Sequence, residues 1–398
     1  MTGLLSALLL VPIRLCLRLQ SLCYWALVYS TAGLTATLVL TRITWRGLRA
    51  PRHVFRWTMR QQPPACLRDP VLGEHSYLRG MSSGLRFHYV TKGDTSRPLM
   101  LFLHGFPENW FSWRYQLQEF SSEYHTVALD LRGYGDSDAP RRREDYTLDQ
   151  LLGDIKDVIE SLGELRWEEG WIVTLLTLTL TLLVLCLFPG HRSCVLVGQD
   201  WGGTLAWHFA IEHPAQVRRL VVMSAPHPSA WRDYILRHPC QLLRCSHSSF
   251  FQIPFLPELT LPLEDFQLVR SLMTGRWVGI QNRARRLTEQ ELEAYLYQLS
   301  QPGGLAGPLS YYRSLCSDTP LRHQDVGVAC LLLWGEADAF LGPGLARASR
   351  AYVRGSCAVR IVPGCSHWVQ QDQPEAVNGL IWAFLREGGR GGSTRNNH

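Results

Sequence analysis

The stretch Val195-Leu196-Val197-Gly198-Gln199-Asp200-Trp201-Gly202-Gly203 decides which fold this sequence predicts. An apolar run typical of a buried strand ends in the acid Asp200, which has glycine two residues before it and two and three residues after it. A carboxylate on a strained strand-to-helix turn requires neighbours with almost no side chain, and glycine meets that requirement. Capping of the following helix is the simpler alternative, but a cap does not require three glycines. The stretch therefore predicts a nucleophile elbow with Asp200 at its tip.

On both sides of the elbow, short apolar runs alternate with helical patterns, as in a parallel sheet flanked by helices. Residues 148–162 have apolar positions at helical spacing behind a predicted N-cap at Thr147. Residues 227–320 lack the short apolar runs typical of strands and have helical patterns rich in aromatic residues. The sequence thus predicts an α/β fold with a mostly parallel sheet in two halves, residues 72–226 and 321–387, and a helical lid inserted between them. The predicted strands are residues 99–103, 125–129, 194–197, 220–223, 330–334 and 359–362.

The composition excludes several classes of protein. With 398 residues, of which 46% are apolar, the chain can build one large domain with a full core plus appendages. The formal charge of +6 comes largely from arginines near the N-terminus, and we find no basic motif with interleaved aromatic residues. The eleven cysteines have no short repeating spacing, so they indicate neither a disulfide framework nor a zinc site. We therefore expect a reducing compartment, no nucleic-acid partner, no metal and no cofactor.

The N-terminus has the pattern of a membrane anchor. Residues 19–41 carry no charge and have the length of a transmembrane helix. A cleaved signal peptide is the alternative, and the long, sparsely charged stretch before the apolar run disfavours it. More arginines follow the run than precede it, so the positive-inside rule predicts a single-pass protein whose large domain is cytosolic. We expect residues 1–45 to form the anchor, 46–71 a linker and 388–398 a disordered tail.

A second apolar run does not fit this scheme. Residues 171–188 are uncharged, rich in Leu, Thr and Val, and would pass a hydropathy test for a membrane span. The run nevertheless falls between a predicted helix and a predicted strand of the same domain. If it crossed a bilayer, strands of one sheet would lie on opposite sides of the membrane. We therefore predict that residues 167–190 are an atypical apolar insertion and not a second span.

Two further residues follow predicted strands and complete a catalytic set. Asp338 comes just after residues 330–334, and His367 comes just after residues 359–362. Nucleophile, acid and histidine then occur in the chain order of α/β-hydrolases, each at the carboxyl end of a strand, where open α/β sheets keep their sites. Each residue alone would be an ordinary surface acid or structural histidine. Together with the elbow they predict a triad of Asp200, Asp338 and His367.

A carboxylate in place of serine determines the class of reaction. Attack of a carboxylate on an acyl group would give a labile anhydride, whereas attack on a saturated carbon gives an ester that water can cleave at its carbonyl. The predicted substrate is therefore an electrophilic alkyl carbon. In a second step, neutral His367, oriented by Asp338, would deprotonate the water. We expect the backbone N–H groups of Phe106 and Trp201 to stabilise the oxyanion.

The sequence resembles the epoxide hydrolase family of the α/β-hydrolase fold, over about residues 72–385 apart from the insertion. Residues 101–118 and 300–315 are most similar to the vertebrate epoxide hydrolase 3 group, which also has an N-terminal anchor. The resemblance implies epoxidised lipids such as epoxy fatty acids as substrates, vicinal diols as products, and the endoplasmic reticulum membrane as the location. The motifs that carry it are the Asp200 elbow, Asp338, His104-Gly105-Phe106-Pro107, Gly133-Tyr134-Gly135-Asp136-Ser137-Asp138-Ala139-Pro140 and Gly364-Cys365-Ser366-His367-Trp368.

The lid departs from the family pattern at one position. In the family, two lid tyrosines hold the epoxide oxygen and protonate it, and Tyr312 stands where the second is expected. The first should lie five residues before Gln252 of the Phe-Gln-x-Pro motif, where this chain has His247. His247 either donates a proton, in which case alkylation should accelerate toward pH 6.5, or leaves a single donor. We expect Tyr311 to be a packing residue.

Two other functions are compatible with the same residues. A haloalkane-type dehalogenase uses the same acid, histidine and ester, and needs only donors such as indole N–H groups for the halide. Alternatively, the chain is a catalytically silent membrane protein, disrupted by the insertion at 167–190 and by the change at His247. Diol or halide release, and activity with and without the insertion, would separate these alternatives.

Overall fold

The computed structural model describes residues 2–166, 191–315 and 324–387. The predicted insertion at 167–190 and the predicted tail at 388–398 lie outside the described residues. Within the described residues, nine strands form one sheet in the order β1-β2-β4-β3-β6-β7-β8-β9, with β5 paired to β6. All neighbours from β4 to β9 along this order are parallel. The strands are β1 (Glu74–Arg79), β2 (Arg86–Lys92), β3 (Leu99–Leu103), β4 (His125–Leu129), β5 (Glu164–Arg166), β6 (His191–Gln199), β7 (Val217–Met223), β8 (Cys330–Gly335) and β9 (Cys357–Val362).

The six strands that the sequence predicted are confirmed, and three others were missed. β3 and β4 have the predicted bounds, and the remaining four contain the predicted runs. β1 and β2 pair antiparallel at the edge of the sheet, and β1 is largely exposed. Strands with a solvated face carry polar residues and lack the continuous apolar run by which buried parallel strands are recognised. β5 has only three residues, too few for any period.

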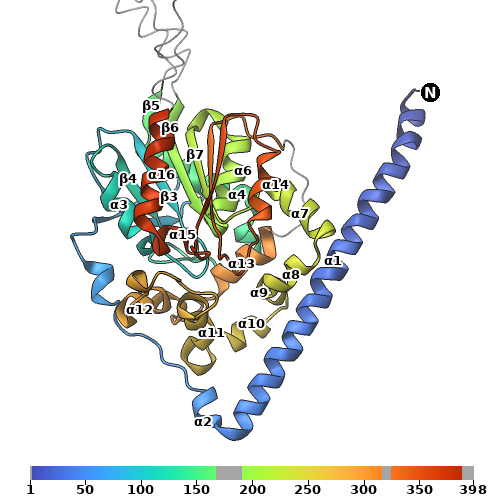
Figure 1. Cartoon of the computed structure of the whole chain (residues 1–398), viewed down its shortest axis with the longest axis vertical. Helices are drawn as coiled ribbons and strands as arrows, with labels where there is room; N and C mark the ends of the chain where they lie inside the picture. Colours follow the sequence, from blue (N-terminus) through green and yellow to red (C-terminus); the bar gives the residue numbers. More distant parts are fainter. Residues whose placement is uncertain (1, 167–190, 316–323, 388–398) are drawn as a thin grey trace, which may run out of the picture.

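Helices cover both faces of the sheet (Figure 1). α3 packs against α16, and α4 packs against α6. The predicted N-cap at Thr147 is confirmed, because the backbone N–H of Thr147 donates to the Gln150 side chain in a capping box. The sheet-flanking helices are α3 (Arg114–Phe120), α4 (Leu148–Leu162), α6 (Asp200–Glu212), α14 (Gly344–Arg350), α15 (Val369–Asp372) and α16 (Pro374–Glu387), and 3-10 turns occur at η1 (Ala65–Arg68), η2 (Trp110–Trp113), η3 (Arg143–Tyr146), η5 (Pro214–Gln216) and η6 (Arg283–Arg285).

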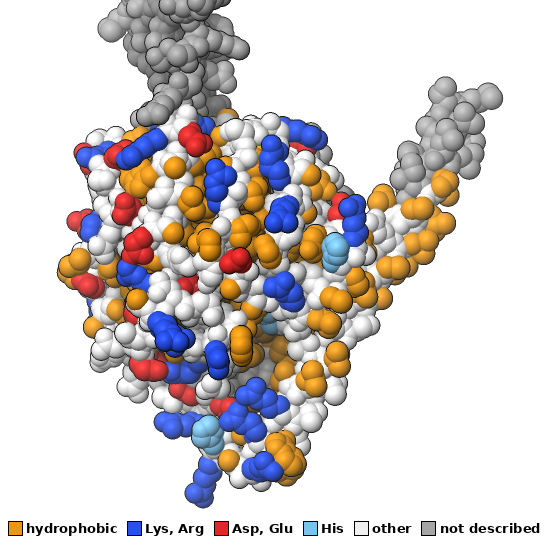
Figure 2. Space-filling view, viewed as in Figure 1, with side chains coloured by type: hydrophobic (Ala, Val, Ile, Leu, Met, Phe, Trp, Pro, Cys, Tyr) orange, Lys and Arg blue, Asp and Glu red, His pale blue; other side chains and the backbone are white. Residues whose placement is uncertain are grey.

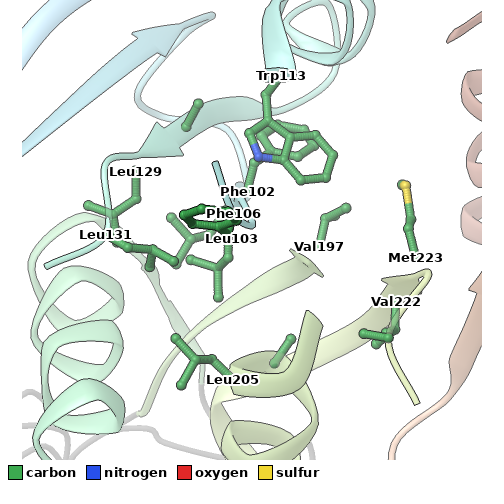
Figure 3. Close-up of a cluster of buried hydrophobic side chains, with 14 of the residues drawn as sticks. Phe102, Leu103, Phe106, Trp113, Leu129, Leu131, Val197, Leu205, Val222 and Met223 are labelled. Carbon is green, nitrogen blue, oxygen red and sulfur yellow. The ribbon is translucent and has the colours of Figure 1, made fainter. Parts of the chain in front are cut away.

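The core lies between the sheet and these helices (Figure 3). Phe102 of β3 stacks on Trp113, with 5.1 Å between ring centroids, and both are fully buried. On the other face of the sheet, Leu205 of α6 is buried as well. Truncation of an aromatic residue in such a core costs about 3–5 kcal/mol. This packing holds the ends of β3 and β6 side by side, with Leu103 paired to Gly198.

The chain between β7 and β8 folds into helices that cover the carboxyl ends of the parallel strands (Figure 1). This is the region where the sequence predicted a lid, and we call it the lid below. Arg313 joins two of its parts, because its guanidinium donates to the carbonyls of Phe251 and Ile253 and pairs with Glu258. The lid helices are α7 (Pro228–Arg237), α8 (Cys240–Arg244), α9 (Ser246–Phe250), α10 (Leu256–Thr260), α11 (Leu263–Thr274), α12 (Glu289–Leu299) and α13 (Ala306–Leu315).

The N-terminal helix α1 (Thr2–Arg49) is longer than the predicted anchor and is followed by α2 (Pro51–Val54). Its part Leu15–Arg49 is long and apolar enough to cross a membrane. Within the predicted linker, residues 46–71, the chain contacts the lid. Arg60 pairs with Asp265 and Glu293 of the lid at 2.9 and 2.7 Å. A bidentate arginine between two carboxylates fixes this segment to the lid.

Candidate active site

The turn between β6 and α6 has the geometry of the predicted elbow. Asp200 has a φ of 51°, a left-handed conformation that costs about 1–3 kcal/mol for a residue with a side chain. A Cβ atom at Gly202 would lie 2.1 Å from the carbonyl oxygen of Leu103, and one at Gly198 would lie 2.4 Å from the carbonyl oxygen of Gly202. The glycines are therefore required for the close approach of β3, β6 and α6, as the sequence indicated.

The loops after β8 and β9 bring the other two predicted residues to Asp200. His367 Nδ1 lies 2.8 Å from Asp338 Oδ2, and its Nε2 lies 3.5 Å from Asp200 Oδ1. Asp338 Oδ1 accepts hydrogen bonds from the backbone N–H groups of Phe340 and Leu341 at 2.9 and 2.8 Å. These bonds fix the Asp338 carboxylate, which in turn fixes the orientation of the imidazole.

The second oxygen of the Asp200 carboxylate lies among backbone donors. The N–H of Phe106 donates to Asp200 Oδ2 at 3.0 Å, and the N–H of Trp201 also bonds to this carboxylate. Gly105 allows the approach, because a Cβ there would lie 2.5 Å from the Cβ of Asp200. Both predicted oxyanion donors thus bond to this carboxylate, Phe106 to Oδ2, while Oδ1 faces His367.

A cavity of about 1150 Å³ opens above the carboxylate. Asp338 lies behind His367, where it is fully buried. The cavity therefore joins the predicted nucleophile and base to residues from the lid. The predicted site residues that line it are Phe106, Asp200, Trp201, His247, Tyr312 and His367.

Comparison with known proteins agrees with this geometry. The alpha/beta hydrolase family matches residues 100–380. Epoxide hydrolase 4 of Mus musculus is 48% identical over 376 residues, which cover 94% of this chain and 97% of the relative. Epoxide hydrolase 3 of Xenopus tropicalis is 47% identical and covers 96% of this chain and 97% of its own. The chain belongs to the epoxide hydrolases of the alpha/beta hydrolase family.

A solved structure of an epoxide hydrolase from Bacillus megaterium, a mutant in complex with its diol product, is also similar. It is 30% identical with a TM-score of 0.64, and the match covers 78% of this chain and all of that one. The expected resemblance to the epoxide hydrolase 3 group is confirmed, and the comparisons place epoxide hydrolase 4 at a similar level of identity. The fold that the sequence predicted is therefore the fold of this family.

The two lid residues of this epoxide hydrolase lie on one side of the cavity. The Tyr312 ring packs edge-on against Trp201 and Phe106, with 4.7 and 5.4 Å between ring centroids. His247 of α9 lies 6.1 Å from the Tyr312 ring and 5.1 Å from the Phe340 ring. The lid therefore brings both candidate donors to the same cavity, as counting from the Phe-Gln-x-Pro motif predicted.

Tyr311 points away from this cavity, as expected of a packing residue. It is fully buried, and its hydroxyl donates to the carbonyl of Arg132 at 2.9 Å. Its ring packs on Tyr134 and Tyr146. Two neighbouring tyrosines of α13 thus have different surroundings, one in the core and one in the cavity.

The electrostatics of the triad favour an ion pair before substrate binds. Burial alone would lower the pKa of His367, but the carboxylates of Asp338 and Asp200 outweigh it and raise the pKa to about 10. Burial opposes ionisation of Asp200 in the same way, yet the hydrogen bond and positive charge of His367 hold the pKa of this carboxyl below its usual range. The resting site therefore contains an imidazolium between two carboxylates.

The pKa of His247 is shifted in the opposite direction to that of His367. Burial lowers its pKa to about 4, and the nearby carboxylate of Asp200 only partly offsets that effect. At neutral pH the imidazole is uncharged and can donate only as a neutral tautomer. The predicted acceleration of alkylation toward pH 6.5 would therefore have to come from a small protonated fraction, since the pKa lies well below that pH.

Two residues of the site escaped the sequence analysis. Glu108 is buried beside the oxyanion loop, where it accepts from the N–H of Gly105 at 3.2 Å and from the Gln371 amide at 2.6 Å. Burial raises its pKa to about 7. Phe340 packs edge-on against His367 at 5.3 Å. Glu108 follows the His-Gly-Phe-Pro motif directly, and an acid inside the apolar segment 106–111 was the signal available.

Proposed function

We propose that the chain hydrolyses epoxides to vicinal diols through a covalent ester on Asp200. The observation that carries the proposal is that the two oxygens of this carboxylate have different surroundings. The N–H of Phe106 donates to Oδ2, while Oδ1 lies at the cavity, 3.5 Å from Nε2 of His367. A carboxylate held in this way is a nucleophile for a saturated carbon.

In the first step, Asp200 Oδ1 forms a bond to an epoxide carbon as the ring C–O bond breaks. The epoxide oxygen takes the electron pair of that bond and a proton from Tyr312, with His247 as a neutral second donor. The product is an alkyl ester of Asp200 that carries the new hydroxyl. The phenolate of Tyr312 regains its proton from water before the next turnover.

In the second step, water adds to the ester carbonyl. His367 takes a proton from this water, and the N–H groups of Phe106 and Trp201 stabilise the developing oxyanion on Oδ2. Formation of the ester removes the negative charge of Asp200, which had raised the pKa of His367. The imidazolium therefore loses its proton more easily at this stage, and the proton it gives to solvent balances the one that the Tyr312 phenolate takes from solvent, so that neutral His367 can act as a base. Collapse of the intermediate breaks the bond between the carbonyl carbon and Oδ1, the leaving alkoxide takes the proton from His367 to complete the diol, and the acid formed at Asp200 returns a proton to His367.

The proposed substrates are lipid epoxides, in particular epoxy fatty acids. A cavity of about 1150 Å³ exceeds the usual size for small ligands, which is roughly 300–1,000 Å³. We further propose that α1 anchors the chain in the endoplasmic reticulum membrane with the catalytic domain in the cytosol. The apolar segment Leu15–Arg49 and the excess of arginines after it support the anchor and its orientation, and the family resemblance supports the organelle.

A haloalkane-type dehalogenase remains the second candidate because of one indole. Trp201 Nε1 is buried and has no acceptor within residues 2–166, 191–315 and 324–387, so it could donate to a halide. The two reactions differ in what they release. Incubation of the full chain with styrene oxide and with a chloroalkane should yield diol from the first and no halide from the second. Halide release without diol would overturn the proposal.

Single-turnover incubation with an epoxy fatty acid tests the mechanism. The native chain should form diol, Asp200→Asn should not, and His367→Gln should keep the substrate mass on the Asp200 peptide. Diol formation by Asp200→Asn at the native rate would overturn the proposal. A native chain without epoxide turnover would favour the silent variant, the third possibility that the sequence left open.

A further inference from the structure

The wall of the catalytic cavity is built partly by the N-terminal helix. Leu17, Gln20, Tyr24 and Val28 of α1 line the same cavity as Asp200. These four residues follow one another at intervals of three, four and four, so they form one stripe along the helix. At about 1.5 Å per residue the stripe is roughly 16 Å long. The helix α1, which was expected to serve as a membrane anchor, thus also lines the catalytic cavity.

The same face of α1 is seated firmly on the lid. Tyr24 and Val28 form a buried cluster with Ile235, Leu242 and Cys245 of α7 to α9. Farther along the helix, the small residues at 32 and 36 continue this face and are also buried. In Figure 1, α1 runs alongside the lid helices α8 and α9. Of the two lid helices that contact α1, α9 is the one that carries His247.

The opposite face of α1 is apolar and exposed to solvent. Figure 2 shows apolar side chains along this helix. The leucines at 15, 19, 22, 34 and 38 are 52–66% exposed, and the helix contains no acidic residue. The hydroxyls of Thr31, Thr35 and Thr37 donate to the carbonyls four residues before them, so they do not depend on water. Such a face is suited to lipid acyl chains.

We propose that α1 is a guide as well as an anchor, and that lipid epoxides pass from the bilayer along the α1 stripe to Asp200. This inference rests on the proposed epoxide hydrolysis and membrane attachment. The occupant of the outer face of α1 is the lipid bilayer, since five arginines and no acid accompany its apolar residues. Because the inner face of α1 stays packed on the lid, the helix in this proposal lies along the cytosolic surface of the membrane and does not cross the bilayer. A lipid that leaves the bilayer beside α1 can follow the side chains from Leu17 to Val28, which line the same cavity as the Asp200 carboxylate.

Kinetic measurements with two substrates test whether lipid epoxides reach Asp200 along the α1 stripe. The full chain is bound to phosphatidylcholine vesicles that contain epoxidised oleic acid, and the water-soluble styrene oxide is measured in parallel. Leu17→Trp and Val28→Trp narrow the stripe, while Leu22→Trp is the matched control on the lipid-facing side. We expect both stripe variants to lower the ratio of kcat/KM for the vesicle-borne epoxide to that for styrene oxide by about tenfold or more, as steric changes in apolar pockets do. The control should leave the ratio unchanged.

Leu17 is 54% exposed, so its replacement should not disturb folding even if Val28→Trp does. All variants should float with vesicles to the same extent, which would show that a change in the kinetic ratio is not caused by loss of membrane binding. An unchanged ratio in Leu17→Trp, with flotation intact, would overturn the inference and leave the proposed function standing. If the native chain hydrolyses neither epoxide, it is the proposed function that fails.

Photolabelling gives an independent readout. A long-chain epoxide with a diazirine at its far end is trapped as the Asp200 ester in His367→Gln and then irradiated. The label should appear in the tryptic peptide of residues 19–42, which contains Tyr24 and Val28. An ester on Asp200 with label confined to other peptides would contradict the guide. Failure to form the ester would contradict the proposed mechanism instead.

Discussion

At the scale of single residues, the proposed mechanism predicts that the lid donors determine how fast the epoxide ring opens. Tyr312 has a phenol beside the nucleophile, whereas His247 offers only a neutral imidazole with a pKa of about 4. Loss of one donor at a developing oxyanion costs about 2.7–4 kcal/mol, or about a hundredfold to a thousandfold in rate. We expect Tyr312→Phe to slow single-turnover alkylation by this factor and His247→Tyr to accelerate it.

Alkylation by the native chain should show no inflection from His247 between pH 5.5 and 8, because the pKa of this group lies below that range. Rapid-quench measurement of the protein ester checks both statements. Equal rates for the native chain and His247→Tyr would show that position 247 does not contact the epoxide oxygen.

The raised pKa of His367 predicts how the free energy of unfolding changes with pH. Its pKa in the folded chain is about 10, above the ordinary value of about 6.5. The folded state therefore holds a proton that the unfolded state loses, and the stabilisation is complete below about pH 6.5 and is lost as pH rises through 10. The difference in unfolding free energy between the native chain and His367→Gln should shrink from pH 7 to pH 10 in denaturant titrations. A difference that stays constant over this range would show that His367 is neutral at rest.

At the scale of elements, the chain offers a clean test of the apolar insertion. Arg166 of β5 lies directly opposite His191 of β6 in an antiparallel pair, so the two residues that flank 167–190 are neighbours. A two-residue Asn-Gly turn can join such strands. Replacement of residues 167–190 by Asn-Gly should keep the melting temperature and the turnover of styrene oxide, and should raise the soluble yield.

Loss of the fold after this replacement would mean that the segment is part of the domain. If the shortened chain were active and the native chain inactive, the insertion would be what silences the enzyme. The matched control is the same replacement in Asp200→Asn, which should fold and remain inactive.

The elements also show what could be predicted from the sequence. Buried parallel strands are continuous apolar runs, so β3 and β4 were predicted with their bounds, and the triad followed because each member comes directly after such a strand. Edge strands such as β1 have no such run. The contribution of Glu108 depends on contacts with residues more than 250 positions away, and no local pattern contains them. Burial, which determines the pKa of His247, is likewise a property of the assembled lid.

At the scale of the whole molecule, we propose that the outer face of α1 binds the membrane while its inner face contributes to the catalytic cavity. An acid within the apolar part of a bilayer costs about 2.5–3.5 kcal/mol, so Leu22→Glu with Leu38→Glu should lower vesicle binding at least about tenfold. Both side chains are exposed, so turnover of styrene oxide should not change. Met81→Glu, which places an acid at an exposed apolar position of the catalytic domain, is the control. Vesicle flotation measures the effect, and undiminished binding of the double variant would show that this face does not enter lipid.

The covalent ester is the central claim, and a single turnover in water labelled with oxygen-18 tests it most directly. If Asp200 attacks the epoxide and water then attacks the ester carbonyl, the new hydroxyl of the diol comes from the carboxylate. With excess enzyme, the diol should therefore carry unlabelled oxygen, and the peptide that contains Asp200 should gain one labelled oxygen atom. Labelled oxygen in the diol from the first turnover, with none in Asp200, would mean that water opens the epoxide directly and would contradict the account.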